Sequence, residues 1–202
     1  MIQPIPTKYK GITFRSRIEA RTAIFLDALR VQWQYEKEGY FFNIAENIEN
    51  DRLKKEDKEF YAKRHKSGLI PYLPDFYIPN QARFKECFIE VKGKNPTNEE
   101  HDKARLLCHD TKLPIFFLWD FPFIEDNNSV ETHLDGYYYN EKGVFNIRNA
   151  ESLAWGYNDC FCEYGEKIVI ANEAYFTCKI GDTSDRVTPC IDAYNAARNV
   201  KF

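Results

Sequence analysis

The chain has 202 residues, of which 44% are hydrophobic and 16% aromatic, which suits one sizeable packed domain and excludes a disordered chain. Its formal net charge of −3 is not that of a basic protein that coats nucleic acid, although a local basic surface remains compatible with it. No segment has the apolar length of a signal peptide or a membrane span. We therefore expect a cytoplasmic protein whose six cysteines are thiols or metal ligands.

Residues 15–30 predict an amphipathic helix, because apolar side chains recur there at the helical period. Ser16 followed by Glu19 three positions later is a capping-box pattern. Three arginines surround this helix and would suit either phosphate contacts or a solvated face. They are Arg15, Arg17 and Arg21.

Extended segments follow the helix, and we expect strands over residues 31–36 and 40–45. The mixed-charge stretch 46–66 then predicts a solvated loop or a short surface helix inserted between strands.

The middle of the chain predicts strands over residues 71–79 and 86–93 and a buried strand over 113–121. Between the last two lies a helix over 97–111, opened by a second capping box from Thr97 to Glu100. This element order predicts an α/β fold with a mixed central sheet flanked by helices.

After residue 120 the pattern changes to short hairpin-like segments. The expected pairs are 136–139 with 144–147 and 167–172 with 174–180, and a short helix is expected after Thr188 and Pro189. We expect a core over residues 1–120 and a small β-rich C-terminal module over 121–202.

Pro74-Asp75-Phe76 and Ile89-Glu90-Val91-Lys92-Gly93 carry the most specific chemical pattern. Side chains alternate along a strand, so Glu90 and Lys92 share one face, and a neighbouring strand would bring Asp75 close to Glu90. Two carboxylates and the Val91 backbone carbonyl are hard oxygen ligands that suit Mg²⁺ or Mn²⁺. Lys92 would lie beside a metal-bound water and favour its hydroxide form.

The set Glu19, Asp75, Glu90 and Lys92 resembles the PD-(D/E)xK nuclease superfamily, whose core order is αβββαβ. Further stretches are similar to small nucleases of phages and mobile elements, and the likeness covers residues 8–120. They include Tyr9-Lys10-Gly11, Phe14-Arg15-Ser16-Arg17-Ile18-Glu19-Ala20-Arg21, Trp33-Gln34-Tyr35-Glu36 and, more loosely, Ala193-Tyr194-Asn195-Ala196-Ala197-Arg198.

The resemblance implies a restriction-endonuclease-like core and a Mg²⁺-dependent DNA endonuclease in a bacterial host cell. By analogy with relatives that act as dimers, we expect a homodimer. Glu19, Asp75, Glu90 and the Val91 carbonyl would hold the metal, and Lys92 would act on the attacking water. RNA cleavage is a further possible activity, because these groups would contact the phosphate, which DNA and RNA share, and not the 2′-hydroxyl that distinguishes them. A rival from another class is a catalytically silent module of the same fold that binds nucleic acid or a protein partner.

Several of these residues also have an ordinary structural interpretation. Glu-x-Lys on a strand can be a simple ion pair, Asp75 a strand-end aspartate, and Glu19 only a helix cap. Glu36 would support the site rather than bind metal, and Lys103 would either face the site or coat its helix. The basic residues of 46–66 would suit a DNA-contacting arm, but interleaved acidic residues nearly cancel their charge.

Four cysteines, Cys160, Cys162, Cys178 and Cys190, could hold one zinc ion in the C-terminal module. Their Cys-x-Cys spacing is unusual for such a site, and cysteine is also a common small buried residue. His101 and His109 lack a ligand spacing with the carboxylates, and we expect solvated helix histidines there.

Overall fold

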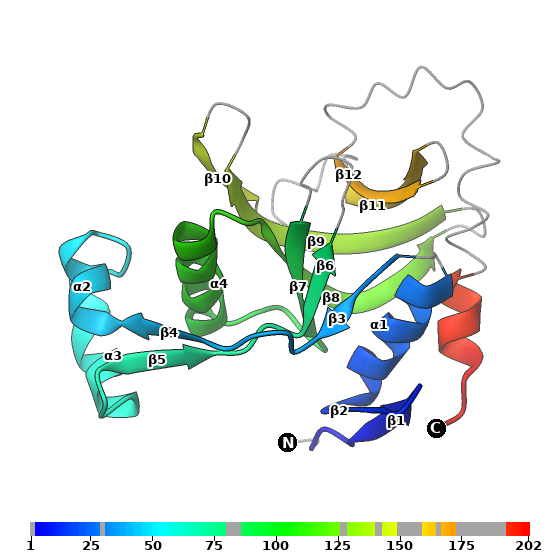
Figure 1. Ribbon diagram of the computed structural model, residues 1–202, viewed down its shortest axis with the longest axis horizontal. Coiled ribbons are helices and arrows are strands. Elements are labelled where there is room, and N and C mark those ends of the chain that lie inside the picture. The colour runs from blue at the N-terminus through cyan, green and yellow to red at the C-terminus, as the bar shows by residue number, and fades with distance from the viewer. Residues whose placement is uncertain are drawn as a thin grey trace.

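The computed structural model describes residues 3–28, 31–79, 86–125, 129–139, 143–148, 159–164, 167–172 and 193–202. The protein is a mixed α/β structure built on a six-stranded sheet with the strand order β10-β9-β8-β7-β6-β3 (Figure 1). Its strands are β3 (Gln34–Tyr35), β6 (Phe76–Pro79), β7 (Glu86–Lys92), β8 (Ile115–Glu125), β9 (Ser129–Tyr139) and β10 (Phe145–Arg148). The predicted mixed sheet is confirmed.

Only β7 and β8 pair in parallel, and the other neighbours in this sheet are antiparallel. A parallel pair needs a crossover connection, and α4 (Asn98–Thr111) supplies it between these two strands. Thr97 caps α4 together with Glu100 in a complete capping box, as the sequence predicts. This connection brings the first turn of α4 next to the end of β7.

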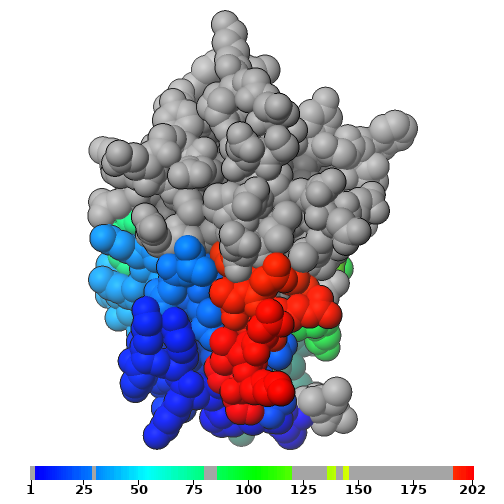
Figure 2. Space-filling model, turned by 90° about the vertical axis from the view of Figure 1, so that its right-hand side faces the viewer, coloured from blue at the N-terminus to red at the C-terminus, as the bar shows by residue number. Residues whose placement is uncertain are grey.

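The sheet separates two apolar layers, because successive residues of its strands point to opposite faces. Ile89 and Val91 of β7 pack in a cluster with α1 (Arg17–Ala28), whereas Phe88 packs with residues of α4. The C-terminal helical residues 193–199 complete the α1 layer through Ala193 and Ala197. Figure 2 shows these C-terminal residues packed beside the N-terminal part of the chain.

A short hairpin precedes α1 and consists of β1 (Thr7–Tyr9) and β2 (Ile12–Phe14). Its two turn residues, Lys10 and Gly11, have φ angles of 47° and 82°. Positive φ at both positions is the requirement of a type I′ turn, which matches the twist of the flanking strands.

Residues 40–72 form a projecting arm, which contains β4 (Tyr40–Asn43), α2 (Ile44–Glu49), η1 (Lys55–Asp57), α3 (Lys58–Arg64) and β5 (Leu69–Tyr72) (Figure 1). β4 and β5 pair with each other as an antiparallel ribbon. The Tyr61 hydroxyl joins the arm to the core by donating to Asp102 of α4 over 2.5 Å.

The arm corrects two boundary predictions. The strand expected over 40–45 ends at Asn43, because the Asn43 side chain accepts a hydrogen bond from the Glu46 amide and caps α2. The strand expected over 71–79 is two strands, β5 and β6, and Asp75 lies in the break between them. Pro74 has no amide hydrogen to donate to a ladder, which agrees with an interruption at this point.

Two other strand predictions also need correction. The strand expected over 31–36 is reduced to Gln34 and Tyr35, which pair with β6. Residues 167–172 do form a strand, β12 (Lys167–Asn172), but it pairs with β11 (Asp159–Tyr164). The partner expected for it, 174–180, lies outside the described residues, as do Thr188 and Pro189.

The predicted pair of 136–139 with 144–147 corresponds to the antiparallel contact of β9 with β10. β8 runs across residue 120, and β9 and β10 extend the same sheet beyond it. The division into a core and a C-terminal module at residue 120 stays a prediction. In the described part of the chain, no helix is long and apolar enough to cross a membrane.

Candidate active site

Three chain segments meet where the break between β5 and β6 faces the end of β7. Asp75 comes from the break, Glu90 and Lys92 come from β7, and Glu19 comes from the first turn of α1. All three carboxyl side chains are buried, with relative exposures of 7% for Glu19, 2% for Asp75 and 5% for Glu90. The carboxyl groups of this cluster are therefore shielded from bulk water.

Asp75 is held between the backbone of β7 and an arginine. Its Oδ2 accepts a hydrogen bond of 2.7 Å from the Val91 amide, and its Oδ1 pairs with the Arg15 guanidinium. The Asp75 amide donates to Glu90 Oε2 over 3.3 Å, which brings the two acidic residues together as the sequence predicts.

Glu90 and Lys92 share a face of β7 and form an ion pair of 2.8 Å between Lys92 Nζ and Glu90 Oε1. Lys92 Nζ lies at the same distance from Oε1 of Glu100, in the first turn of α4. The other oxygen of Glu90 accepts from the Tyr72 hydroxyl over 3.1 Å. Lys92 is therefore fixed by two carboxylates, one on its own strand and one on the crossover helix.

Glu19 contacts both the start of α1 and the polar cluster. Its amide donates to the Ser16 hydroxyl over 3.3 Å, so the Ser16 side chain caps the helix, and the Glu19 carboxylate accepts from that hydroxyl over 2.6 Å. Its Oε2 also accepts from the Tyr35 hydroxyl and lies 3.8 Å from Arg15 Nε. This oxygen therefore belongs to the same polar cluster as Asp75.

Arg15 is the central cation of the cluster. Its guanidinium contacts Asp75 and Glu19, and its Nε lies 2.8 Å from Glu36 Oε1. The Arg15 side chain is 53% exposed, so the cluster reaches solvent at this residue. The arginines near α1 were expected on a solvated face or at phosphates, and for Arg15 the contact with three carboxylates is the observed arrangement.

The protonation equilibria reflect this crowding. Burial, followed by the charges of Glu90 and Glu19, raises the pKa of Asp75 well above its ordinary value, against the opposing effect of Arg15. Burial opposes the charge of Lys92, but Glu90 and Glu100 outweigh that cost and raise its pKa. Burial alone would raise the pKa of Glu100, yet Lys92 and Thr97 lower it to about 2. Lys92 is therefore a protonated ammonium at neutral pH.

The donor set fits a hard divalent cation in its chemistry. The charges of Glu90 and Glu19 destabilise the ionised form of Asp75, which means that the three carboxylates are close enough to repel one another. A divalent cation would relieve this repulsion, and oxygen ligands suit Mg²⁺ or Mn²⁺. Within the described ranges, no three or more His, Cys, Asp or Glu side chains are grouped to hold a metal, and protein donors now occupy these oxygens.

Sequence reasoning missed four contributors to the site: Arg15 in its central position, Tyr35, Tyr72 and Glu100. The spacing of four residues between Arg15 and Glu19 is a helical ion-pair spacing and could have indicated the first of them. The hydroxyls of Tyr35 and Tyr72 reach the site only through tertiary contacts. Glu100 was identified from sequence as a helix cap, and its second contact with Lys92 was not foreseen.

Other residues singled out from the sequence lie near the cluster or apart from it. Lys103 pairs with Glu99 over 2.8 Å on α4 and does not contact Asp75 or Glu90. His109 is not a solvated histidine, because it stacks on Phe145, contacts the Tyr139 hydroxyl over 2.7 Å, and has its pKa lowered to about 4 mainly by burial. His101 is also half-buried.

The four cysteines that could bind zinc are only partly within the described residues. Cys160 and Cys162 lie on β11, and Cys178 and Cys190 lie outside the described residues. The zinc site stays a prediction.

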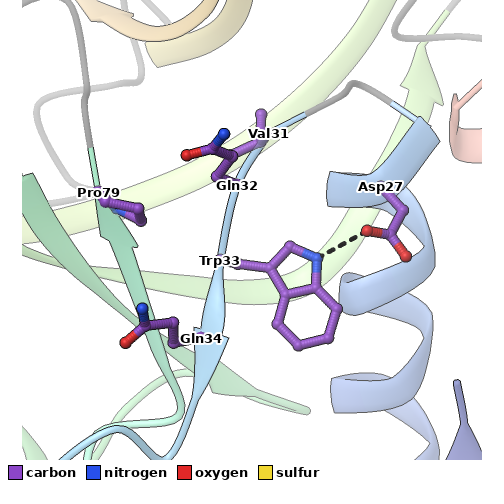
Figure 3. A pocket seen from close by; sticks show the side chains of 6 residues that line it. All are labelled: Asp27, Val31, Gln32, Trp33, Gln34 and Pro79. Carbon is purple, nitrogen blue, oxygen red and sulfur yellow. Dashed lines mark hydrogen bonds between the residues drawn. The ribbon is translucent and has the colours of Figure 1, made fainter.

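A pocket of about 530 Å³ lies beside β3 and is lined by Asp27, Val31, Gln32, Trp33, Gln34 and Pro79 (Figure 3). The Trp33 indole points to α1 and donates to Asp27 over 3.0 Å. The other Asp27 oxygen already contacts Tyr9 and Lys10, so this carboxylate is engaged in structural contacts. None of the acidic-cluster residues lines this pocket.

No family model matches this chain, and no match to it was found among curated proteins or solved structures. The functional argument therefore depends on the site itself.

Proposed function

We propose that the protein is a metal-dependent DNA endonuclease that hydrolyses phosphodiester bonds through a PD-(D/E)xK active site on a restriction-endonuclease-like core. The observation that supports this most directly is the meeting of Asp75, Glu90 and Lys92 at one end of the sheet. Asp75 lies in the break before β6, whereas Glu90 and Lys92 lie on β7, and a solvated Glu-x-Lys ion pair would not need a buried aspartate beside it.

The element order supports the same proposal. α1, β3, β6, β7, α4 and β8 follow one another as helix, three strands, helix and strand, with the arm inserted between the first two strands. This is the αβββαβ order of the superfamily that the sequence resembles.

In this proposal Asp75, Glu90 and the Val91 carbonyl hold Mg²⁺, or Mn²⁺ in its place, and Glu19 completes the set. The bound metal would polarise the phosphodiester and lower the pKa of an attacking water. Lys92 stays protonated, because Glu90 and Glu100 raise its pKa. Its ammonium therefore orients the water and offsets the charge that develops on the phosphate oxygens. Arg15 has to give up part of its contact with Asp75 when the cation enters.

The alternative function is a silent module of the same fold that binds nucleic acid or a protein partner. One observation favours it: Arg15 and Lys92 already neutralise the carboxylates that would bind metal. Metal affinity distinguishes the two functions, since a site closed permanently by these cations has no need of Mg²⁺.

The test is cleavage of labelled duplex, nicked, single-stranded and four-way-junction DNA with Mg²⁺, Mn²⁺ or EDTA. Wild type is compared with Lys92→Ala and Asp75→Asn, and RNA of the same sequence is included. We expect metal-dependent cutting by the wild type that both variants lose, and the preferred substrate would name the subclass. No cutting of any substrate, together with no Mg²⁺ or Mn²⁺ binding by calorimetry, would favour the silent module.

The resemblance to phage and mobile-element nucleases also leads us to propose such a genetic context, in the cytoplasm of a bacterial host. A single site cuts one strand, so a homodimer would be needed for a double-strand break. Sedimentation with and without DNA tests this part of the proposal.

A further inference from the structure

Basic side chains gather at the end of α3, whereas lysines and acidic residues alternate over η1 and the start of α3. Acidic residues lie on α2 and at the start of α3, whereas the last turn of α3 carries Lys63 and Arg64. Lys66 follows in the turn to β5, and all three of these basic side chains are exposed. Among the residues that the structure describes, no ion pair involves Lys63 or Lys66. The end of α3 is therefore a local basic surface on a chain of net negative charge.

One carboxylate of α4 gathers further positive groups at this end of the arm. Glu99 contacts Lys103 Nζ over 2.8 Å and Arg64 over 3.2 Å, and His65 Nε2 lies 3.8 Å away. Two lysine or arginine cations thus share one acidic partner, with a histidine beside them. Glu99 positions these groups without neutralising all of their charge.

Glu99 also connects the basic surface with the proposed active site. The next residue, Glu100, binds Lys92 over 2.8 Å, so two consecutive residues of the first turn of α4 hold Lys92 on one side and Arg64 on the other. The end of α3 and Lys92 therefore both lie beside the first turn of α4. In Figure 1 the arm extends away from this end of the sheet.

Helix electrostatics accounts for only part of this arrangement. The partial negative charge at a helix C-terminus favours Lys63 and Arg64 in the last turn of α3. It does not account for Lys66, which lies beyond the helix, or for Lys103, which comes from a different helix. Convergence from two elements beside the proposed active site indicates a surface for an anion.

We propose that Lys63, Arg64 and Lys66, supported by Lys103, bind the phosphate backbone of duplex DNA next to the phosphate that is cut. This inference depends on the proposed nuclease function for its substrate. Lysine and arginine side chains that contact phosphates position a duplex without reading its sequence. The surface would therefore hold the strand in register and leave sequence preference to other parts of the chain.

The experiment measures binding of labelled duplex DNA by fluorescence anisotropy in EDTA at several salt concentrations, and cleavage separately in Mg²⁺ or Mn²⁺. The variant Lys63→Ala/Arg64→Ala/Lys66→Ala is compared with Lys54→Ala/Lys55→Ala/Lys58→Ala, which removes the same charge from exposed positions of the same arm. Circular dichroism and thermal melting verify that both variants are folded.

We expect the first variant to bind at least about 10-fold more weakly, and to lose about 2–3 units of slope in a plot of log affinity against log salt. The control variant should stay within about twofold of wild type, because its lysines lie outside the phosphate path. Equal losses in both variants, or no loss in either, would overturn the proposed surface.

These outcomes separate this inference from the nuclease proposal. If wild type cuts DNA and the first variant binds DNA as tightly as wild type, the nuclease proposal stands and the proposed surface is wrong. If the first variant binds DNA more weakly but wild type does not cut any DNA, the surface stands and the nuclease proposal is wrong. Wild type that neither binds nor cuts DNA overturns both.

Discussion

Lys92 Nζ lies 2.8 Å from Oε1 of Glu100, and the other oxygen of that carboxylate accepts from both the amide and the hydroxyl of Thr97. One glutamate thus caps α4 and positions the lysine proposed to act on the attacking water. The crossover helix is therefore part of the proposed active site as well as a connection between parallel strands.

We expect Glu100→Gln to lower the rate of DNA cleavage about 10-fold, in the range found when a supporting partner of an active-site group is removed. Glutamine can still serve the capping box but loses the ionic contact with Lys92 that lowers the pKa of Glu100, so the free energy of unfolding at neutral pH should also fall. Thr97→Ala is the matched control, with a loss of about 1 kcal/mol of stability and near-normal cleavage. Equal cleavage rates in wild type and Glu100→Gln would contradict a positioning role for Glu100.

The raised pKa of Asp75 predicts how the free energy of unfolding depends on pH. Its pKa is raised in the folded state, so the folded protein holds this proton more tightly than the unfolded chain does. In EDTA, its contribution to stability should therefore decline as pH rises above about 4. Asp75→Asn lacks this titration, and its stability should improve relative to wild type between pH 4 and 7.

Urea unfolding at several pH values measures this difference, with the exposed Asp51→Asn as the control that should follow wild type. A constant difference between Asp75→Asn and wild type across the pH range would contradict the raised pKa.

Arg15→Ala should destabilise the protein in EDTA by about 1–3 kcal/mol, because it leaves buried carboxylates without their shared cation. The lower end is expected, since the Arg15 side chain is 53% exposed. Mg²⁺ should restore more stability to this variant than it adds to wild type, because the two cations compete for Asp75. Thermal melts with EDTA or Mg²⁺ measure both effects, and Arg17→Ala, also exposed, is the control. Identical melts for the two variants would disprove the competition.

Gly136→Ala tests the packing of the sheet. A Cβ at this position would lie 2.3 Å from the Ile115 carbonyl oxygen and 2.7 Å from the Phe116 ring. We expect a loss of about 1–3 kcal/mol in the free energy of unfolding, as for other overpacked positions. Gly93→Ala is the control, because nothing lies within 4 Å of its added Cβ. Chemical denaturation that finds the two variants equally stable would show that β8 and β9 are less closely packed than described.

The parts of the site that depend on local pattern were predictable from the sequence. Alternation along β7 puts Glu90 and Lys92 on one face, and the Thr97 capping box begins α4 where it was expected. The proximity of Asp75 and Glu90 followed from pairing their two strands. Each of these inferences needs only periodicity or near neighbours in the chain.

The remaining parts depend on contacts between distant segments. The Tyr72 hydroxyl reaches Glu90 because β5 ends just before the break that contains Asp75, and no periodic pattern marks that break. For the arm, the sequence left a solvated loop and a short surface helix as alternatives, and the structure has the two helices α2 and α3 there. Their charged residues read as a solvated stretch, whereas Leu53 and Tyr61 pack inward against the α4 layer. The central position of Arg15 depends on Asp75, which is 60 residues away in the chain.

The antiparallel ribbon of β4 and β5 has a consequence for how this protein could diversify. Tyr40 pairs with Tyr72, so the arm leaves the core and returns to it at neighbouring points. A segment with adjoining ends can be lengthened, shortened or exchanged at a small entropic cost. The helices of the arm could therefore be replaced, in evolution or by engineering, while Tyr72 at the base of the arm keeps its hydrogen bond to Glu90. If the proposed nuclease function holds, proteins with the same Asp75, Glu90 and Lys92 cluster and different arms are expected to differ in the nucleic acids they accept.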